Sequence, residues 1–410
     1  MEDVLNNELY IKKILSFSSL NELKICSLLN SKWNKEAVER LHEISTTHLN
    51  LDYSNNHARL RAYLRMVECA GGRIVTQHPN LSARLKFEPR SREEQDDTIL
   101  FLVDAFLKFG QNVRTLLISV DFNKGLPTRA QYMELFSTLQ NIERLRVSLQ
   151  NETCLQISSY YPFYWNLPSL KEFWFEFSGQ IEGSEVLSRV IVNPLISSAK
   201  QLTTLICERY DVMRPILREV KKLGRLGQIE EIVTGSPPPG VELTDSILLN
   251  VPHLSHIELI IRTSKDVSST NVILTEYADR LTSLCLTLEG SSNDENVLIF
   301  PSMQKLRILG IKLRTPTLLQ LPLTIKAWTG SLPKLQIFKL YANNRQICHD
   351  FCSKIFSSLG AETEYQLCQV AKVIFSLEDA NEENEIDTEF INQMQNYFPN
   401  AQIITGSKNP

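Results

Sequence analysis

Residues 332–340 read Leu-Pro-Lys-Leu-Gln-Ile-Phe-Lys-Leu and contain the pattern that decides the fold. An apolar lead residue, Leu335, is followed by apolar residues three and five positions later. Proline fixes φ and disfavours helix in the residue before it, so Pro333 ends a preceding helix and starts an extended segment. The alternation that follows has a period of two, which is typical of a strand with one buried face. The same proline, two residues before a lead residue, recurs at Pro168, Pro252 and Pro301.

This pattern returns along most of the chain. Its lead residues are 22 to 35 residues apart over ten intervals, and chance placement of apolar residues would not hold so regular a spacing. A weaker copy occurs at Ile229/Ile232, and a last copy at Ala401/Ile404. The full copies are Val113/Leu116/Ile118, Ile142/Leu145/Val147, Leu170/Phe173/Phe175, Leu202/Leu205/Cys207, Leu254/Ile257/Leu259, Leu281/Leu284/Leu286, Met303/Leu306/Ile308, Leu335/Phe338/Leu340 and Val370/Val373/Phe375.

Between the predicted strands the apolar period becomes helical. Examples are the stripes over residues 128–139 and 347–359, the second of which ends at Gly360, a residue typical of helix C-caps. A strand and a helix alternating within about 28 residues are typical of a leucine-rich repeat. Stacked units of this kind share one continuous core. We therefore expect an α/β horseshoe solenoid of eleven to thirteen repeats over residues 42–410, with parallel strands inside and helices outside.

The proline-led starts and irregular repeat lengths resemble the leucine-rich repeats of F-box proteins. The resemblance runs from Val113 to the C-terminus and extends back to His48-Leu49-Asn50-Leu51. The asparagine ladder of shorter repeats is absent, which favours the longer, intracellular type.

Residues 4–41 follow a different pattern, that of three short helices. Leu9, Ile11, Ile14 and Leu15 predict the first helix. Ser19 and Glu22 form a capping box for a second helix that carries Leu23, Cys26, Leu28 and Leu29, and Trp33 begins a third helix that ends near Leu41. Three helices in so few residues cannot bury enough surface to be stable alone, so they need a neighbour.

This order of residues resembles an F-box, including the cysteine, the short polar stretch and the tryptophan over residues 26–33. The chain departs from the family at Asn6, where a proline usually lies at the contact with the Skp adaptor. The resemblance implies a non-catalytic subunit of an SCF-type ubiquitin ligase, which binds the Skp adaptor and through it a cullin. The implied adaptor-binding residues are Leu5, Glu8, Ile11, Ile14, Leu15, Phe17, Leu20, Leu23 and Trp33.

The alternative interpretation makes residues 1–41 a cap. A solenoid needs a terminal unit that covers its first repeat. In that case the chain is a leucine-rich-repeat interaction scaffold that acts independently of ubiquitin.

The concave face of the horseshoe is the predicted target-binding surface. Residues between the buried apolar positions of each strand point into this face, and they include both acidic and basic side chains, which favours a protein or peptide target. Aromatic residues and arginine often anchor interfaces. The loop over residues 160–165, with five aromatic residues in six, either covers the strand edges or binds the target. The candidate residues are Arg146, Trp174, Glu176, Glu208, Glu258, Arg307, Lys339 and Tyr341 on the strands, and Tyr161 and Trp165 in the loop.

Other classes of function are less well supported. Cys348 and Cys352 share a helix face but lack a second pair with zinc-ligand spacing, so we interpret them as packed thiols. No paired carboxylates, nucleophile elbow or phosphate-binding loop is apparent, and we expect neither catalysis nor a cofactor. A net charge of −4 without a basic run argues against a nucleic-acid partner.

The sequence also bears on the compartment. The most apolar stretch, residues 98–109, is about half the length that spans a bilayer. Glu2 and Asp3 at the start are the opposite of a secretory n-region. Eight scattered cysteines are typical of a reducing compartment, so we expect the cytoplasm or nucleus and no membrane association.

Overall fold

The computed structural model describes residues 8–44, 47–52, 65, 81–87, 106–107, 110–121, 139–150, 165–177, 192–235, 247–289, 298–314, 330–356, 369–377 and 388–407. The chain divides into two compact units, Met1–Leu202 and Thr203–Pro410, and each is described by itself. The helical stripe predicted at 128–139 and the apolar stretch 98–109 lie almost wholly outside the described residues.

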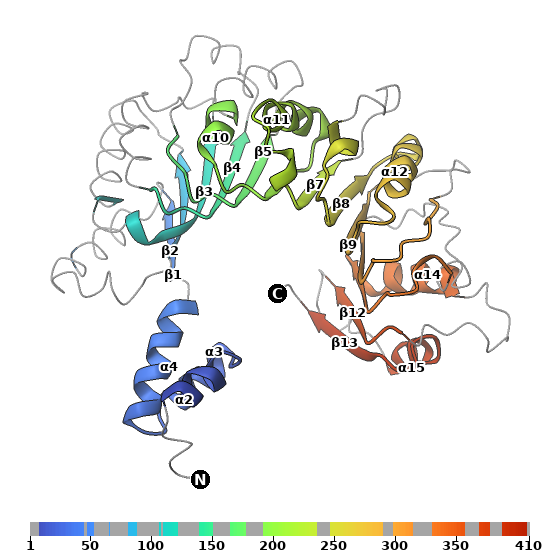
Figure 1. Cartoon of the computed structure of the whole chain (residues 1–410). Helices are drawn as coiled ribbons and strands as arrows, with labels where there is room; N and C mark the ends of the chain where they lie inside the picture. Colours follow the sequence, from blue (N-terminus) through green and yellow to red (C-terminus); the bar gives the residue numbers. More distant parts are fainter. Residues whose placement is uncertain are drawn as a thin grey trace. The chain divides into compact units, whose positions relative to one another are not determined.

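Three helices open the first unit: α2 (Glu8–Leu15), α3 (Leu20–Cys26) and α4 (Ser31–Ile44) (Figure 1). Their shared core consists of Ile11, Leu15, Leu23 and Ala37, with three partly buried residues packed against it: Cys26, Trp33 and Leu41. The predicted capping box is confirmed, since the Glu22 carboxylate accepts the Ser19 N–H at 2.6 Å and the Ser19 hydroxyl accepts the Glu22 N–H at 3.4 Å.

The predicted second helix was too long. Helix α3 ends at Cys26, and the Leu28 N–H already bonds the Ile25 carbonyl in a turn. The Asn30 side chain then accepts the N–H groups of Lys32 and Trp33 and starts α4. The consequence is that Leu28 and Leu29 lie outside the helix and are 84% and 60% exposed.

The rest of the first unit is a parallel sheet whose strands pair in chain order (Figure 1). The 3₁₀ helix η1 (Gly110–Asn112) precedes β3, and helix α10 (Asn193–Ser198) follows β5. Strand β2 was not recognised in the sequence, although Pro79 lies two residues before Leu81. A bulge at Leu81/Ser82 places the next inward positions, Ala83 and Leu85, two and four residues after Leu81 instead of three and five. The strands are β1 (Thr47–Asp52), β2 (Leu81–Phe87), β3 (Val113–Asp121), β4 (Arg144–Gln150) and β5 (Glu172–Phe177).

The second unit repeats a strand and a connecting segment eight times, and all its described strand pairings are parallel and sequential. Its strands are β6 (Thr204–Cys207), β7 (Glu231–Gly235), β8 (His256–Ile261), β9 (Ser283–Leu288), β10 (Ile308–Leu313), β11 (Ile337–Ala342), β12 (Lys372–Leu377) and β13 (Gln402–Ser407). Its helices are α11 (Tyr210–Lys222), η6 (Leu226–Gln228), η8 (Ile247–Asn250), α12 (Ser264–Tyr277), α14 (Arg345–Phe356) and α15 (Thr388–Tyr397).

The core of the second unit lies between one face of these strands and the helices that follow them (Figure 1). Apolar residues of the repeated pattern, such as Leu284, Leu309 and Phe338, pair across neighbouring strands and are fully buried. The helix predicted from residue 347 is confirmed as α14, which begins at Arg345. An α/β architecture of parallel strands and helices is therefore confirmed, while the leucine-rich-repeat and F-box assignments stay predictions.

Two predicted registers were wrong. In β10, Leu309 pairs with Leu284 and Phe338 on the buried side, so the lead residue of this repeat is Leu306 and not Met303. The two neighbouring intervals then become 25 and 29 residues, which is more regular than the predicted 22 and 32. In β13, Ile404 pairs with Ile374, so Ile403, not Ile404, lies on the core side of the sheet.

Candidate protein-interaction surfaces

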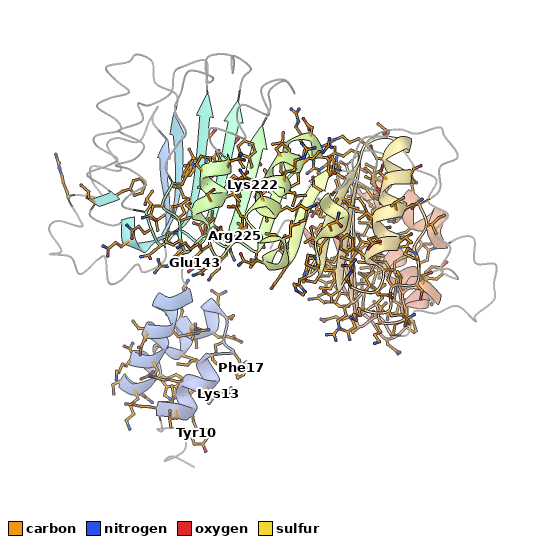
Figure 2. All side chains as sticks on the ribbon, turned by 45° about the horizontal axis from the view of Figure 1, so that its top comes forward. Tyr10, Lys13, Phe17, Glu143, Lys222 and Arg225 are labelled. Carbon is orange, nitrogen blue, oxygen red and sulfur yellow. The ribbon has the colours of Figure 1, made fainter. Side chains whose placement is uncertain are left out.

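The first candidate surface lies on the N-terminal helices. Among the described residues, ten large apolar side chains are exposed, and seven of them fall between residues 9 and 29. We call these seven residues the helical apolar surface. Two of them, Tyr10 and Phe17, lie along one edge of the helices in Figure 2, with Lys13 between them. The surface comprises Leu9, Tyr10, Ile14, Phe17, Ile25, Leu28 and Leu29.

The residues predicted to bind the Skp adaptor divide into two groups. Glu8, Ile14 and Phe17 are exposed and available to a partner. Ile11, Leu15 and Leu23 are at most 1% exposed, so they hold the three helices together and cannot touch a partner while the helices stay folded. This corrects their predicted role, because the helical stripe that they form faces inward.

Three further predicted adaptor residues have other positions. Trp33 is half-buried against the helical core. Leu20 begins α3, with its side chain outside the described part, and Leu5 lies outside the described residues. The prediction missed Tyr10, which the spacing of Tyr10, Ile14 and Phe17 at i, i+4 and i+7 could have placed on one helix face.

Charged residues frame the helical apolar surface. The ammonium group of Lys13 lies 5.2 Å from the centre of the Phe17 ring. Lys12 pairs with the buried Glu36 carboxylate at 3.4 Å, and this hydrogen bond and charge raise the pKa of Lys12. The hydrogen bonds from Ser19 lower the pKa of Glu22. The surface is thus apolar with a basic residue at its edge.

The second candidate surface is the strand face opposite the core, which we call the open face in each unit. In the first unit it brings together three predicted target-binding residues, because Arg146 lies beside Trp174 in the parallel ladder. The Arg146 guanidinium stacks 3.6 Å from the centre of the Trp174 ring and forms an ion pair with Glu176. The Trp174 ring is therefore half-covered, and its buried indole N–H has no hydrogen-bond partner among the described residues.

The predicted aromatic loop over residues 160–165 lies mostly outside the described residues. Tyr161 lies outside the described residues, and Trp165 is half-buried just before β5. The role of this loop in binding stays a prediction.

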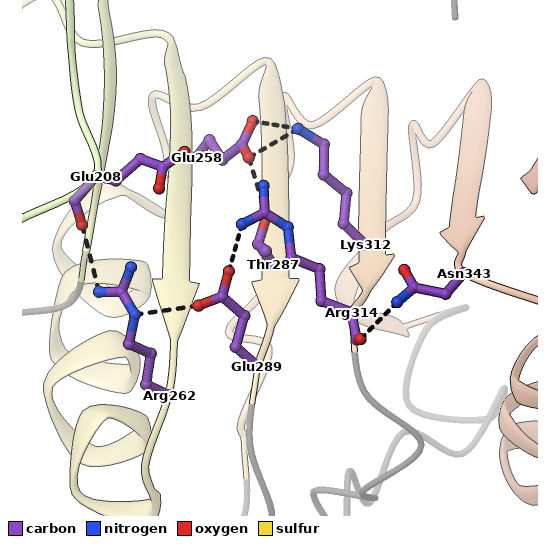
Figure 3. Close-up of polar contacts among 8 residues, drawn as sticks. All are labelled: Glu208, Glu258, Arg262, Thr287, Glu289, Lys312, Arg314 and Asn343. Atoms are coloured by element: carbon purple, nitrogen blue, oxygen red, sulfur yellow. Dashed lines mark hydrogen bonds and ion pairs between the residues drawn. The ribbon is translucent and has the colours of Figure 1, made fainter. Parts of the chain in front are cut away.

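The open face of the second unit carries an ion pair that spans three strands. The Lys312 ammonium lies 2.8 and 2.9 Å from the two carboxylate oxygens of Glu258 (Figure 3). Lys312 belongs to β10 and Glu258 to β8, so the pair crosses β9, where the Thr287 hydroxyl donates to Glu258 at 2.9 Å. Burial raises the pKa of the Cys285 thiol, also on β9, to about 12, so this thiol is uncharged at neutral pH.

A second row of charges follows the ends of the same strands. The Glu289 carboxylate is shared by two guanidinium groups, Arg262 at 3.1 Å and Arg314 at 2.5 Å (Figure 3). Arg262 also donates to the Glu208 carbonyl at 3.4 Å, and the Asn343 side chain donates to the Arg314 carbonyl at 2.7 Å. Three of these contacts join neighbouring repeats, and the bond from Arg262 to Glu208 joins repeats that are two apart.

The predicted open-face residues of the second unit are mostly confirmed in position. Glu258 is central to the face, and Lys339 and Tyr341 lie on β11 with half-buried side chains. Arg307 was misplaced together with the register of β10, since it precedes the strand, and Gly310 and Lys312 occupy the corresponding open-face positions.

The prediction missed the row that includes Arg262, Glu289 and Arg314. Each of these residues is eight positions after the corrected lead residue of its repeat, which is the next position on the same face.

Other sites add little chemistry. Cys348 and Cys352 are buried one turn apart on α14, and burial raises the pKa of Cys352. Within the described ranges, no three histidine, cysteine or acidic side chains are placed to hold a metal ion. Within the same ranges, no helix has the length and apolar composition needed to cross a bilayer.

Comparisons with known proteins leave the function to be argued from these surfaces. No protein-family model matches the chain, and no curated protein is significantly similar to it.

Proposed function

We propose that this chain is the substrate-recognition adaptor of an SCF-type ubiquitin ligase. In this proposal the helical apolar surface binds the Skp adaptor, and through it a cullin, while the open strand face binds a target protein. The chain itself is non-catalytic, and it acts in the cytoplasm or nucleus. The exposed apolar side chains of α2, α3 and the turn after α3 carry the proposal.

The energetics favour a protein partner for the helical apolar surface. Burying one large apolar side chain contributes about 1.5–3 kcal/mol, and an exposed apolar cluster commonly marks an interaction site. Phe17 and Leu9 are each 78% exposed, so most of this gain is still available to a partner. An amphipathic helix that lays its apolar face into a groove is a common recognition mode.

The strands support the second half of the proposal. A sheet of parallel strands with helices behind them is the architecture of a leucine-rich-repeat horseshoe, whose concave face binds proteins. Arg146 and Trp174 on one open face, and Glu258 with Lys312 on the other, supply aromatic and charged groups of the kind that anchor interfaces.

A ubiquitin-independent scaffold is the alternative. It is favoured by the short distance in sequence between α4, which ends at Ile44, and β1, which begins at Thr47. A helical segment so close to the first strand is suited to cap a solenoid. In this case the helical apolar surface would pack on the chain's own first repeat.

The test is co-expression with a Skp adaptor, followed by size-exclusion chromatography. We expect the full chain to co-elute with the adaptor, and the double variant Ile14→Asp, Phe17→Asp to lose co-elution, because charge on this surface opposes burial. The matched control is Lys35→Asp, which changes the charge by the same two units on the exposed side of α4. A folded wild-type chain that fails to co-elute, or co-elution that survives the double variant, contradicts the proposal.

A further inference from the structure

The open face of the second unit separates its charges along the sheet. Four acidic residues belong to the part from β6 to β9: Glu208, Glu231, Glu258 and Glu289. Strands β10 to β13 contain no aspartate or glutamate. Their open face, including the residue after β10, has four cations, which we call the basic strand face: Lys312, Arg314, Lys339 and Lys372.

Two of these cations have carboxylate partners. Lys312 is paired with Glu258, and Arg314 shares Glu289 with Arg262, so that one carboxylate serves two guanidinium groups. Lys339 and Lys372 have no ion pair with any residue in the described parts of the chain, and their side chains are half-buried. A cation held in place without a partner is available to an anionic ligand.

Apolar side chains lie between the unpaired cations. Between β11 and β12, Lys339 pairs with Ile374 and Ile337 pairs with Lys372. Between β12 and β13, Ile374 pairs with Ile404. The three isoleucines are half-exposed, and Tyr341 follows Lys339 on the same face. Cations and apolar groups therefore alternate on β11 and β12, and β13 adds a third isoleucine, which suits an extended ligand with both kinds of group on one face.

We propose that the basic strand face binds an acidic segment of the target, one that presents carboxylates and aliphatic side chains in turn on the same face. This inference deepens the proposed function, on which it rests, by naming the chemistry of the target. Carboxylates pair with Lys339 and Lys372, and the aliphatic side chains cover Ile374 and Ile404. In a strand, alternate residues point to the same side, so an extended segment offers these groups at a spacing of two residues.

A peptide fits this face better than a nucleic acid. The whole chain carries a net charge of −4, which opposes the approach of a long polyanion. The isoleucines gain only from an apolar partner, which a sugar-phosphate backbone does not provide. A short acidic segment avoids the repulsion and covers the isoleucines.

The test measures binding of a labelled, acetylated peptide that repeats Glu-Ser-Leu-Ser, so that glutamate and leucine alternate on one face of the extended chain, to the full chain by fluorescence anisotropy. We expect binding that weakens as salt rises from about 0.1 M to about 1 M, where the Debye length falls from about 10 Å to about 3 Å. The variant Lys339→Glu, Lys372→Glu should weaken binding by about tenfold or more, because it places like charges against the ligand.

The matched control is Lys305→Glu, Lys334→Glu, which makes the same charge change at exposed positions before β10 and β11. It should bind the peptide as the wild type does. A control peptide with lysine in place of glutamate, and a single-stranded thymidine oligonucleotide, should bind at least about tenfold more weakly.

Equal loss of binding in both double variants, no binding by the wild type, or tighter binding of the oligonucleotide would each overturn this inference. The Lys339→Glu, Lys372→Glu protein should still co-elute with the Skp adaptor, because the substitutions leave α2 and α3 unchanged. Failure of the target inference is therefore distinguishable from failure of the proposed function.

Discussion

The Tyr277 side chain joins a helix to the loop beside it through two buried hydrogen bonds. Tyr277 lies at the end of α12 and is fully buried. Its hydroxyl accepts the Val251 N–H at 3.1 Å and donates to the Leu248 carbonyl in η8. Both partners belong to the backbone just before β8, so one hydroxyl satisfies two buried polar groups that have no access to water.

Replacing Tyr277 with phenylalanine should destabilise the protein by about 1–3 kcal/mol, because the Val251 N–H and Leu248 carbonyl are left buried and unpaired. The measurement is urea unfolding followed by circular dichroism. Tyr341→Phe is the control, since no hydroxyl bond of Tyr341 is found within the described residues and its side chain is half-exposed. Equal losses in the two variants would argue against this role of Tyr277.

A glycine at the end of β7 allows an arginine side chain to connect the two strands on either side of it. Gly235 is the last residue of β7, which lies between β6 and β8. Arg262, the residue after β8, donates a hydrogen bond across Gly235 to the carbonyl of Glu208, the residue after β6. A Cβ atom at Gly235 would lie 2.7 Å from the Glu208 carbonyl oxygen and 3.3 Å from the Arg262 guanidinium. The absence of a side chain there allows the close approach of backbone and arginine.

We expect Gly235→Ala to destabilise the protein by about 1–3 kcal/mol, because the added methyl group must displace backbone or break the Arg262 bridge. The control is Gly330→Ala, where a Cβ atom would meet nothing within 4 Å. Thermal unfolding compares the two variants with the wild type. A melting temperature that falls equally in both, or in neither, would show that the space at Gly235 does not matter.

At the scale of the whole molecule, the second unit keeps several weak acids protonated in its interior. Burial raises the pKa of Cys207 and Cys285 from 9.0 to about 12, and that of Tyr277 from 10.0 to about 12. These groups ionise readily only when the chain unfolds. Above the ordinary pKa the unfolded state therefore binds fewer protons than the folded state, and stability falls as pH rises.

The free energy of unfolding should decrease between about pH 9 and pH 12, by up to about 1.4 kcal/mol per pH unit for each buried thiol. Urea unfolding at several pH values measures this slope. The variant Cys207→Ala, Cys285→Ala should show a smaller slope, whereas the control Cys26→Ala leaves both of these thiols in place. The same slope in all three proteins would assign the alkaline effect to other groups.

The sequence by itself determined most of the local structure. The apolar period predicted α2 and, from the stripe over residues 347–359, α14. The Ser19/Glu22 capping box predicted the start of α3, and the repeated apolar pattern predicted most of the parallel strands. These features depend on neighbours within about one helical turn or one strand, and such local relations can be read directly from spacing. The open-face positions of Arg146, Trp174 and Glu258 followed from the same alternation.

Only the tertiary structure decided the features that depend on distant partners. The register of β10 was settled by pairing with β9 and β11, since two overlapping apolar patterns fitted that stretch equally well. Burial divided the apolar residues of α2 into Ile11 and Leu15 in the core and Ile14 at the surface. The ion pair between Lys312 and Glu258 joins residues 54 positions apart across a middle strand, and a local pattern carries no information about which of several charges lies within reach.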